Sequence, residues 1–225
     1  MSKPQETVQA PFGNMAIETG HVWGPLDFVG GLACLNFTNT AGGHTKIREV
    51  ERIPTYGDVI NWGLHAELIS PEEARALLAL AKSKPKDAFH RVRELQVFRE
   101  SLHRLVTAIA HKEAPQRADF ARVRGAIAKA LSAADMRPGE TEFDWSADAR
   151  MLGLGTVIAR VALSTHHMLS REKPSQLRQC EVCTWLFIDR TKNQKRRFCR
   201  QDACGNKSRA ERFYSRKRKA TADTV

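Results

Sequence analysis

The stretch that decides how the C-terminal quarter folds is CEVCTWLFIDRTKNQKRRFCRQDAC, residues 180–204. It contains two short cysteine pairs, Cys180-x2-Cys183 and, after fifteen residues, Cys199-x4-Cys204. A tight turn lets each pair place two thiolates on one ion, and zinc prefers tetrahedral thiolate coordination. The spacing therefore predicts one structural zinc ion held by Cys180, Cys183, Cys199 and Cys204.

Two other uses of these thiols stay open at this point. Four cysteines can also hold iron, and a Cys-x-x-Cys pair can carry out thiol–disulfide exchange, although that chemistry would not need the second pair. The fifth cysteine, Cys34, stands alone in an apolar stretch, which predicts a buried small hydrophobe.

The residues between the cysteine pairs predict a hairpin. Residues 185–188 are typical of a strand, residues 189–194 of a polar turn, and residues 195–198 of a return strand. A segment of about 45 residues with few large apolar side chains cannot build a stable core unaided, so we expect the metal to supply much of its folding free energy.

The net charge separates this segment from the rest of the chain. Residues 1–170 carry 20 Lys and Arg against 19 Asp and Glu, a net charge of +1, whereas residues 171–225 carry 16 against 6, a net charge of +10. Four thiolates and one Zn²⁺ would leave about +8 there. A basic module on a neutral body is typical of nucleic-acid binding, while a disordered basic tail is the alternative that the cysteines argue against.

The basic residues fall into two groups. The first lies at the hairpin return and consists of Lys192, Lys195, Arg196, Arg197 and Arg200. The second lies on a predicted helix over residues 204–219, whose stripe of cations we expect beside an apolar strip (Ala210, Phe213 and Tyr214) that packs on the hairpin. A solvated basic helix is the alternative. The residues predicted to contact nucleic acid are Arg196, Arg197, Arg200, Lys207, Arg209, Arg212, Arg216 and Lys219.

The first 170 residues predict a mainly α fold. Apolar spacing and capping residues predict a short amphipathic segment at 58–69 and helices at 71–82, 86–112, about 115–131 and 148–170, with a strand at 140–145. We expect residues 1–20 and 220–225 to be disordered, residues 21–170 to form one helical domain, residues 171–179 to be a linker, and residues 180–219 to be the zinc module.

This helical domain carries no convincing catalytic motif, so we do not expect an enzyme. Its densest set of small polar groups is Asn36, Asn39, Thr40 and His44, which could line a ligand pocket or serve turns and caps. No apolar run of 18 residues occurs, and the polar N-terminus lacks a signal sequence, so we expect a cytoplasmic protein.

The C-terminal segment resembles the CGNR zinc fingers of bacterial proteins regarded as transcription regulators. The resemblance rests on the four cysteines, on Trp185-Leu186-Phe187 with Asp189, and on Cys204-Gly205-Asn206-Lys207 followed by Arg209. Phe198 stands where tryptophan is usual. Lys207 replaces the arginine that names the family, and lysine keeps the charge without the planar fork of the guanidinium.

Residues 30–40, GGLACLNFTNT, resemble the opening motif of the ABATE domain that usually precedes this finger, with Asn36 where aspartate is common; Trp62 also fits. The resemblance implies a helical domain that senses a small-molecule effector or dimerises. We therefore expect a homodimeric transcription regulator whose zinc module binds double-stranded DNA. An RNA-binding zinc module and a protein-interaction adaptor with a purely structural zinc are the alternatives.

Overall fold

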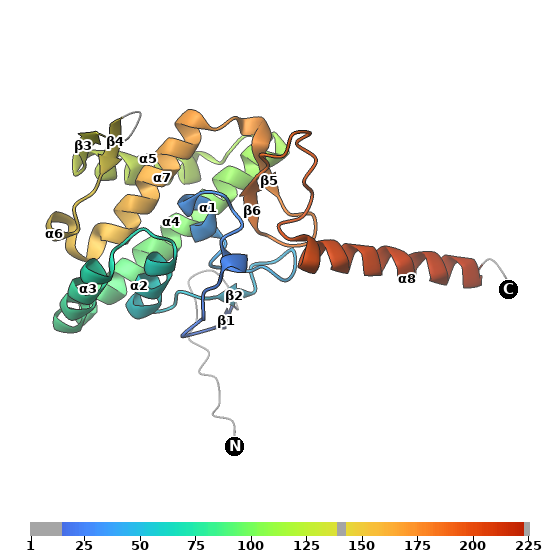
Figure 1. Ribbon diagram of the computed structural model, residues 1–225, viewed down its shortest axis with the longest axis horizontal. Coiled ribbons are helices and arrows are strands. Elements are labelled where there is room, and N and C mark those ends of the chain that lie inside the picture. Colours follow the sequence, from blue (N-terminus) through green and yellow to red (C-terminus); the bar gives the residue numbers. More distant parts are fainter. Residues whose placement is uncertain (1–14, 139–142, 223–225) are drawn as a thin grey trace, which may run out of the picture.

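A computed structural model describes residues 15–138 and 143–222 of the 225-residue chain. The centre of the molecule is α4 (Pro85–His111), which packs against α1 (Ala33–Thr38), α2 (Tyr56–His65), α3 (Pro71–Ser83) and α5 (Arg117–Ser132) (Figure 1). The helix α7 (Thr156–Arg171) packs on α5, α1 and α2. The cysteine-rich segment lies against one end of this bundle, and the last helix, α8 (Asn206–Ala222), projects away from it. The mainly α fold class with a C-terminal zinc-site hairpin and helix is confirmed.

Local sequence signals set the starts of two helices. Thr55 and Ser70 each accept a hydrogen bond from a backbone N–H three residues ahead, and the carboxylates of Asp58 and Glu73 bond back to the cap residues. These capping boxes begin α2 and α3. Pro71 occupies the first position of α3, where its missing N–H costs nothing. The helix predicted at 71–82 is therefore confirmed nearly residue for residue.

The predicted final helix over residues 148–170 is broken. Residues Ala149–Leu152 form α6, Gly153–Gly155 form the 3-10 turn η2, and α7 begins at Thr156. Gly153 has φ +50°, a left-handed conformation that glycine adopts without the steric cost of a Cβ atom. The glycine pair therefore ends one helix and starts another, and this is the reason the unbroken prediction was wrong.

In the part of the chain that the structure describes, three two-stranded sheets flank the helices. β1 (Ala16–Ile17) pairs in parallel with β2 (Val50–Glu51), so the predicted disorder of residues 1–20 is wrong for this strand; residues 1–14 lie outside the described part of the chain. β3 (Asp135–Pro138) pairs antiparallel with β4 (Phe143–Ser146), which confirms the strand predicted at 140–145 for residues 143–145; residues 140–142 lie outside the described part of the chain.

The third sheet corrects the predicted hairpin. β6 (Leu186–Ile188) pairs antiparallel with β5 (Leu177–Gln179), which comes before the first cysteine, and not with residues 195–198. The segment predicted as a linker over 171–179 thus contributes the short turn η3 (Pro174–Gln176) and a strand of the finger. Residues 195–198 form a loop and not a strand, because the Asp189 carboxylate accepts the Arg196 N–H at 2.8 Å.

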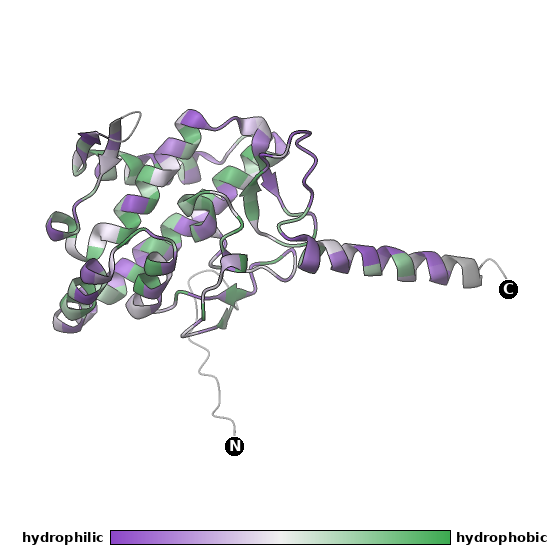
Figure 2. Ribbon diagram, in the orientation of Figure 1, coloured by the Kyte–Doolittle hydropathy of each residue, from purple (hydrophilic) through white to green (hydrophobic). Residues whose placement is uncertain are grey.

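The bundle and the finger share one hydrophobic core. Leu177, Leu186 and Ile188 from the finger strands belong to the same buried cluster as Phe37, Leu95 and Leu102 of the bundle. Figure 2 shows hydrophobic and hydrophilic residues mixed along the helices of the bundle, while α8 is mostly hydrophilic. Cys34 is fully buried in this core, with its sulfur 3.7 Å from Met168 Sδ, as expected for a small hydrophobe.

The helix α8 differs from its prediction in what it contacts. It follows the π-helical turn η4 (Gln201–Gly205) and packs mainly on that turn. Phe213 is 64% exposed and Tyr214 is 63% exposed, so the apolar strip predicted to pack on the hairpin faces solvent. Within residues 15–138 and 143–222, no helix is long and apolar enough to cross a membrane.

Candidate metal centre and nucleic-acid interface

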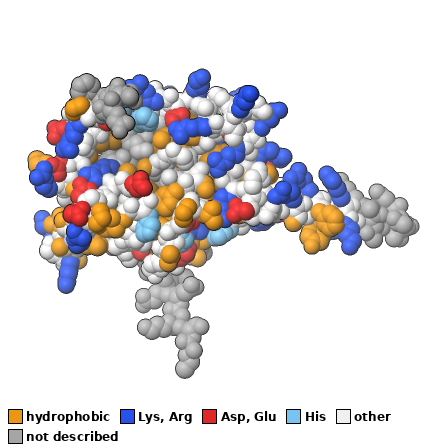
Figure 3. All heavy atoms as spheres, in the orientation of Figure 1, with side chains coloured by type: hydrophobic (Ala, Val, Ile, Leu, Met, Phe, Trp, Pro, Cys, Tyr) orange, Lys and Arg blue, Asp and Glu red, His pale blue; other side chains and the backbone are white. Residues whose placement is uncertain are grey.

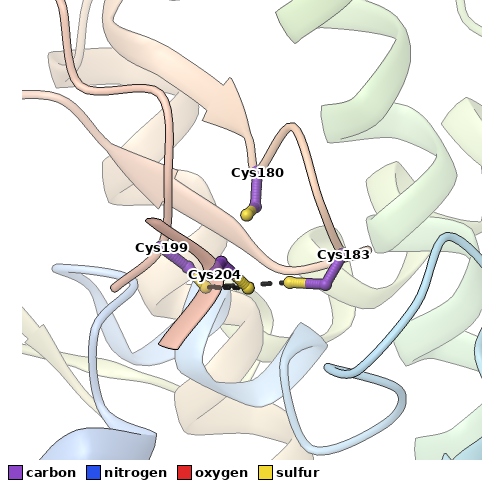
Figure 4. Close-up of side chains that lie close together, drawn as sticks. All are labelled: Cys180, Cys183, Cys199 and Cys204. Carbon is purple, nitrogen blue, oxygen red and sulfur yellow. Dashed lines mark hydrogen bonds between the residues drawn. The ribbon is translucent and has the colours of Figure 1, made fainter. Parts of the chain in front are cut away.

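The four predicted ligands converge at one point. The ligand atoms of Cys180, Cys183, Cys199 and Cys204 all lie within 4.8 Å of one another, and their residues are buried (Figure 4). The Cys183–Cys199 and Cys199–Cys204 sulfur distances are 3.7 and 3.6 Å. A tetrahedron with Zn–S bonds of about 2.3 Å has edges of about 3.8 Å, so these sulfurs are spaced to enclose a Zn²⁺ ion. They are too far apart for disulfides, and all four thiols are free.

Backbone hydrogen bonds position both cysteine pairs. Cys180 N–H donates to Trp185 O at 2.9 Å and closes the first turn, while Val182 N–H donates to the sulfur of Cys180 at 3.5 Å. In the second pair, Gly205 N–H donates to Arg200 O at 3.0 Å across the π turn that carries Cys204.

A second, smaller core surrounds the ligands. Trp185, Phe187 and Phe198 are buried with the four cysteines. The guanidinium of Arg196 stands over the Phe187 ring at 4.2 Å and donates to the carbonyl oxygens of Phe198, at 3.1 Å, and of Cys199. Arg196 therefore stabilises the loop of residues 189–198, called the metal loop below, and its guanidinium is not free to bind a ligand.

Asp189 organises the loop between the cysteine pairs. It is fully buried, and its carboxylate accepts hydrogen bonds from Thr191 N–H at 3.0 Å, from the Thr191 hydroxyl at 2.6 Å and from Arg196 N–H at 2.8 Å. Burial opposes ionisation of Asp189, but these donors outweigh it and lower its pKa. A carboxylate satisfied in this way fixes the loop in one conformation, which replaces the predicted return strand.

The finger is attached to the bundle by a set of specific hydrogen bonds. The amide of Asn39 accepts from Leu186 N–H at 2.8 Å and donates to Leu186 O at 2.9 Å, so it completes the edge of β6. His103 Nε2 lies 2.8 Å from Thr184 O, and Ile188 N–H donates to Gly30 O at 3.0 Å. These contacts place the finger in one orientation on the bundle.

A buried ion network lies behind this junction. Arg99 is fully buried and makes a bidentate ion pair with Glu51, with N–O distances of 2.8 and 2.6 Å. It also donates to Glu100 at 2.9 Å and to the Thr40 hydroxyl at 3.0 Å, while Arg48 pairs with Glu100 at 2.6 Å. Burial opposes ionisation of Glu100, but Arg99 and Arg48 outweigh it and hold its pKa at about 2.

His103 joins this network to the finger. Burial and the nearby Arg48 lower its pKa to about 3. The ring is therefore neutral at physiological pH, and Nε2 carries the proton that it donates to Thr184 O. Since Thr184 follows Cys183 directly, the buried network reaches the chain beside a metal ligand.

The predicted nucleic-acid residues near the metal have partners within the protein. Arg197 forms a bidentate ion pair with Glu181 at 2.6 and 2.5 Å, and Arg200 pairs with Asp202 at 2.7 Å. With Arg196 over Phe187, all three arginines of this group are engaged. Lys192 and Lys195 are exposed and have no polar partner among the described residues.

The basic residues of α8 are more accessible. Arg209 donates to the Asn206 side chain and Arg212 donates to Ser208 O at 3.2 Å, both within the helix, whereas Arg216 and Arg218 have no partner in the described part of the chain. Lys207 donates to His44 O at 3.2 Å. Figure 3 shows Lys and Arg side chains along α8 and on the adjoining edge of the body. The side chain of Lys219 lies outside the described residues.

The polar set at residues 36–44 makes contacts inside the protein. Asn36 accepts from Gly30 N–H at 2.8 Å, Asn39 binds Leu186, Thr40 donates to Phe37 O at 2.8 Å, and His44 N–H donates to Glu49 at 2.7 Å. These hydrogen bonds are of the turn and capping kind, which is one of the two uses that the sequence suggested for this set. The Asn39 amide in addition binds β6 of the finger.

Sequence reasoning missed the residues that dock the finger. Glu51, Arg99, Glu100 and His103 were not singled out, although Arg99 and His103 are four residues apart and lie next to the apolar stripe of the long helix. Two ionisable side chains at that spacing beside Leu95 and Leu102 are a signal for a buried polar contact. Their partners, 48 and 81 residues away, could not be read from the pattern.

Comparison with known families assigns the two parts of the chain. Residues 31–172 match the ABATE family, described as "Putative stress-induced transcription regulator", and residues 176–217 match the CGNR zinc finger. The first match covers more than half of the chain, so the chain belongs to the ABATE family. With the sulfur geometry, the second match identifies a single zinc site with four cysteine ligands. These families point to a transcription regulator and not to an enzyme. No curated protein matches the chain.

Proposed function

Taking membership of the ABATE family as the premise, we propose that this protein is a transcription regulator whose CGNR finger binds double-stranded DNA through α8 and the lysines of the metal loop. The observation that carries the proposal is α8 itself. It is a 17-residue helix that projects from the body and presents Arg212, Arg216 and Arg218 to solvent. An α-helix fits the major groove of B-DNA, and unpaired arginines bind phosphates and guanine edges.

The zinc site supports this role because it fixes the start of α8. Cys204 is the last ligand and lies in the π turn from which α8 begins, so the metal sets the direction in which the helix leaves the finger. When bound, zinc supplies structural coordination with no open position for chemistry, since four cysteines fill the tetrahedron. The chain's own residues then make the contacts with DNA.

A single small finger buries limited surface on DNA, so we propose that the protein acts as a homodimer. The helical domain would supply the dimer contacts and sense an effector. A groove of about 460 Å³ between β4 and α7, lined by Trp145, Arg160, His166 and His167 among others, has a volume that suits a small molecule. Light scattering at micromolar concentration tests the dimer, and a monomeric mass would contradict it.

The first experiment is fluorescence anisotropy with labelled random duplex DNA at low and physiological salt, on zinc-loaded and chelated protein. We expect binding that weakens with salt and disappears on chelation. Equal binding without zinc would show that the C-terminal segment binds only as a nonspecific polycation. Stronger binding of structured RNA in competition would favour the RNA-binding alternative, and no binding at either salt would favour the protein adaptor.

A further inference from the structure

A loop of the helical domain lies against the N-terminal end of α8. Residues 42–47 lie between α1 and β2 in the chain (Figure 1). They contact the finger at Cys180 and at Lys207. Lys46 Nζ donates to the carbonyl oxygen of Cys180 at 2.6 Å, beside the first zinc ligand. Lys207 Nζ, in the first turn of α8, donates to His44 O at 3.2 Å. One lysine from each domain thus reaches across the boundary between them.

The backbone of this loop fits the finger closely. Gly42 has φ +68° and Gly43 has φ +120°, conformations that favour glycine. A Cβ atom at Gly42 would lie 2.5 Å from Thr184 Oγ1, and one at Gly43 would lie 2.6 Å from Trp185 Nε1. Any larger residue would move the loop away from the finger, so the two glycines fix its position relative to α8.

The outer side of the loop is exposed. His44, Thr45, Lys46 and Ile47 are exposed, and Ile47 is 69% exposed. The carboxylate of Glu49 is already engaged, because it accepts from His44 N–H at 2.7 Å and from the Thr45 hydroxyl at 3.0 Å. Lys46 and Lys207 each use one of three ammonium donors on a carbonyl oxygen, which leaves the others available for a further acceptor.

We infer that the nucleic-acid interface extends onto the helical domain, where Lys46 and Lys207 together contact the phosphate backbone of the duplex that lies along α8. This inference rests on the proposed function. Lys46 then belongs to the binding surface although it lies 134 residues before Cys180 in the chain. Because the loop is anchored in the helical domain, any movement of that domain against the finger would change the spacing of the two lysines and the affinity for DNA.

The test places opposite charges next to the loop without disturbing its contacts. Full-length zinc-loaded protein is titrated with random duplex DNA by anisotropy. Ile47→Glu should bind about tenfold more weakly, because the new carboxylate lies beside phosphates, and Ile47→Lys should steepen the salt slope by about 0.9. The matched control is Met151→Glu, which introduces the same charge at an 83% exposed position on α6, at the opposite end of the molecule from α8.

The outcomes separate this inference from the proposed function. Zinc content and thermal unfolding of Ile47→Glu should equal those of the wild type, since its side chain points into solvent. Equal losses for Ile47→Glu and Met151→Glu, or no loss for either, would overturn the extended interface while Arg212→Ala still weakens binding. If Arg212→Ala and Arg216→Ala also bind DNA as the wild type does, the proposed function itself fails.

Discussion

The two halves of the finger are both basic by sequence but use their charges differently. In the docked segment, defined as residues 177–200, Arg196, Arg197 and Arg200 bind carbonyl oxygens, an aromatic ring and carboxylates of the protein. On α8, Arg216 and Arg218 have no partner among the described residues, and Arg212 binds only a carbonyl of its own helix. The docked segment engages its arginines within the protein, whereas those of α8 stay accessible, as the proposed contact with DNA requires.

A count of positive charges therefore overstates the area available for binding a ligand. A guanidinium that fills its donors on the protein contributes to the general field around the finger, but it has little left for a phosphate. The residues to test for DNA contacts are therefore those on α8 and the exposed lysines. The residues to test for folding are those of the docked segment and of the bundle behind it.

The largest expected effect comes from a zinc ligand in the docked segment. Cys183→Ser removes a thiolate from a closed tetrahedral site, and zinc binding supplies much of the finger's folding free energy. We expect loss of zinc, loss of the finger's protection from protease, and loss of DNA binding. Metal content measured by atomic absorption checks this, and an equal content in variant and wild type would contradict it. Ser83→Ala, on α3, is the control.

A smaller effect is expected from the ion network behind the docked segment. Arg99→Met leaves the carboxylates of Glu51 and Glu100 buried with their main cation removed. Breaking a buried ion pair in this way costs about 3–5 kcal/mol. Urea unfolding of zinc-loaded protein should show this loss. Arg75→Met, at an exposed ion pair on α3, should change the free energy of unfolding by less than about 1 kcal/mol.

The pH dependence of stability should reveal His103, which links that network to the docked segment. Its pKa falls from 6.5 to about 3 on folding, so the unfolded chain binds the proton more readily than the native protein. Stability is therefore full above pH 6.5 and decreases as the pH falls from 6.5 toward 3, with a slope of up to about 1.4 kcal/mol per pH unit. His103→Gln should flatten this slope between about pH 6.5 and 5, with zinc content measured at each point. An unchanged slope would show that protonation of His103 does not cause the pH dependence of stability.

A direct comparison of the halves comes from Arg196→Ala. It removes the cation–π contact with Phe187 and the donors to Phe198 O and Cys199 O, so we expect about 2 kcal/mol lower stability and faster loss of zinc to a chelator. At saturating zinc, the affinity for duplex DNA should change less than twofold. A large drop in affinity with unchanged zinc retention would show that Arg196 itself contacts DNA.

The smallest effect is expected from the opposite half. Arg212→Ala on α8 should leave the unfolding free energy and zinc retention unchanged, because the side chain is exposed. It should weaken DNA binding by about 1 kcal/mol and reduce the salt slope by about 0.9. Anisotropy titrations between about 50 and 200 mM salt measure both values. An unchanged slope would exclude Arg212 from the interface.

The sequence predicted those features that depend on short-range patterns. The capping residues located α3, the cysteine spacing located the metal site, and the basic run located α8. The strand pairing was wrong because β6 has two possible partners nearby in the chain, and the pattern gives no preference for β5 over residues 195–198. The buried carboxylate of Asp189 decides between them, and its burial depends on packing that the local sequence does not encode.

The strand β5 also decides where the finger could be separated from the rest of the chain. Its residues precede the first cysteine, and the edge of its partner β6 is completed by Asn39 from near the start of the chain. A recombination event that transferred only residues 180–219 would carry the metal ligands but leave behind one strand and the amide that completes the other. A finger cut at residue 180 would therefore lack one strand of its sheet, whereas residues 176–217, the segment that matches the CGNR finger, retain β5 and lose only their contacts with the helical domain.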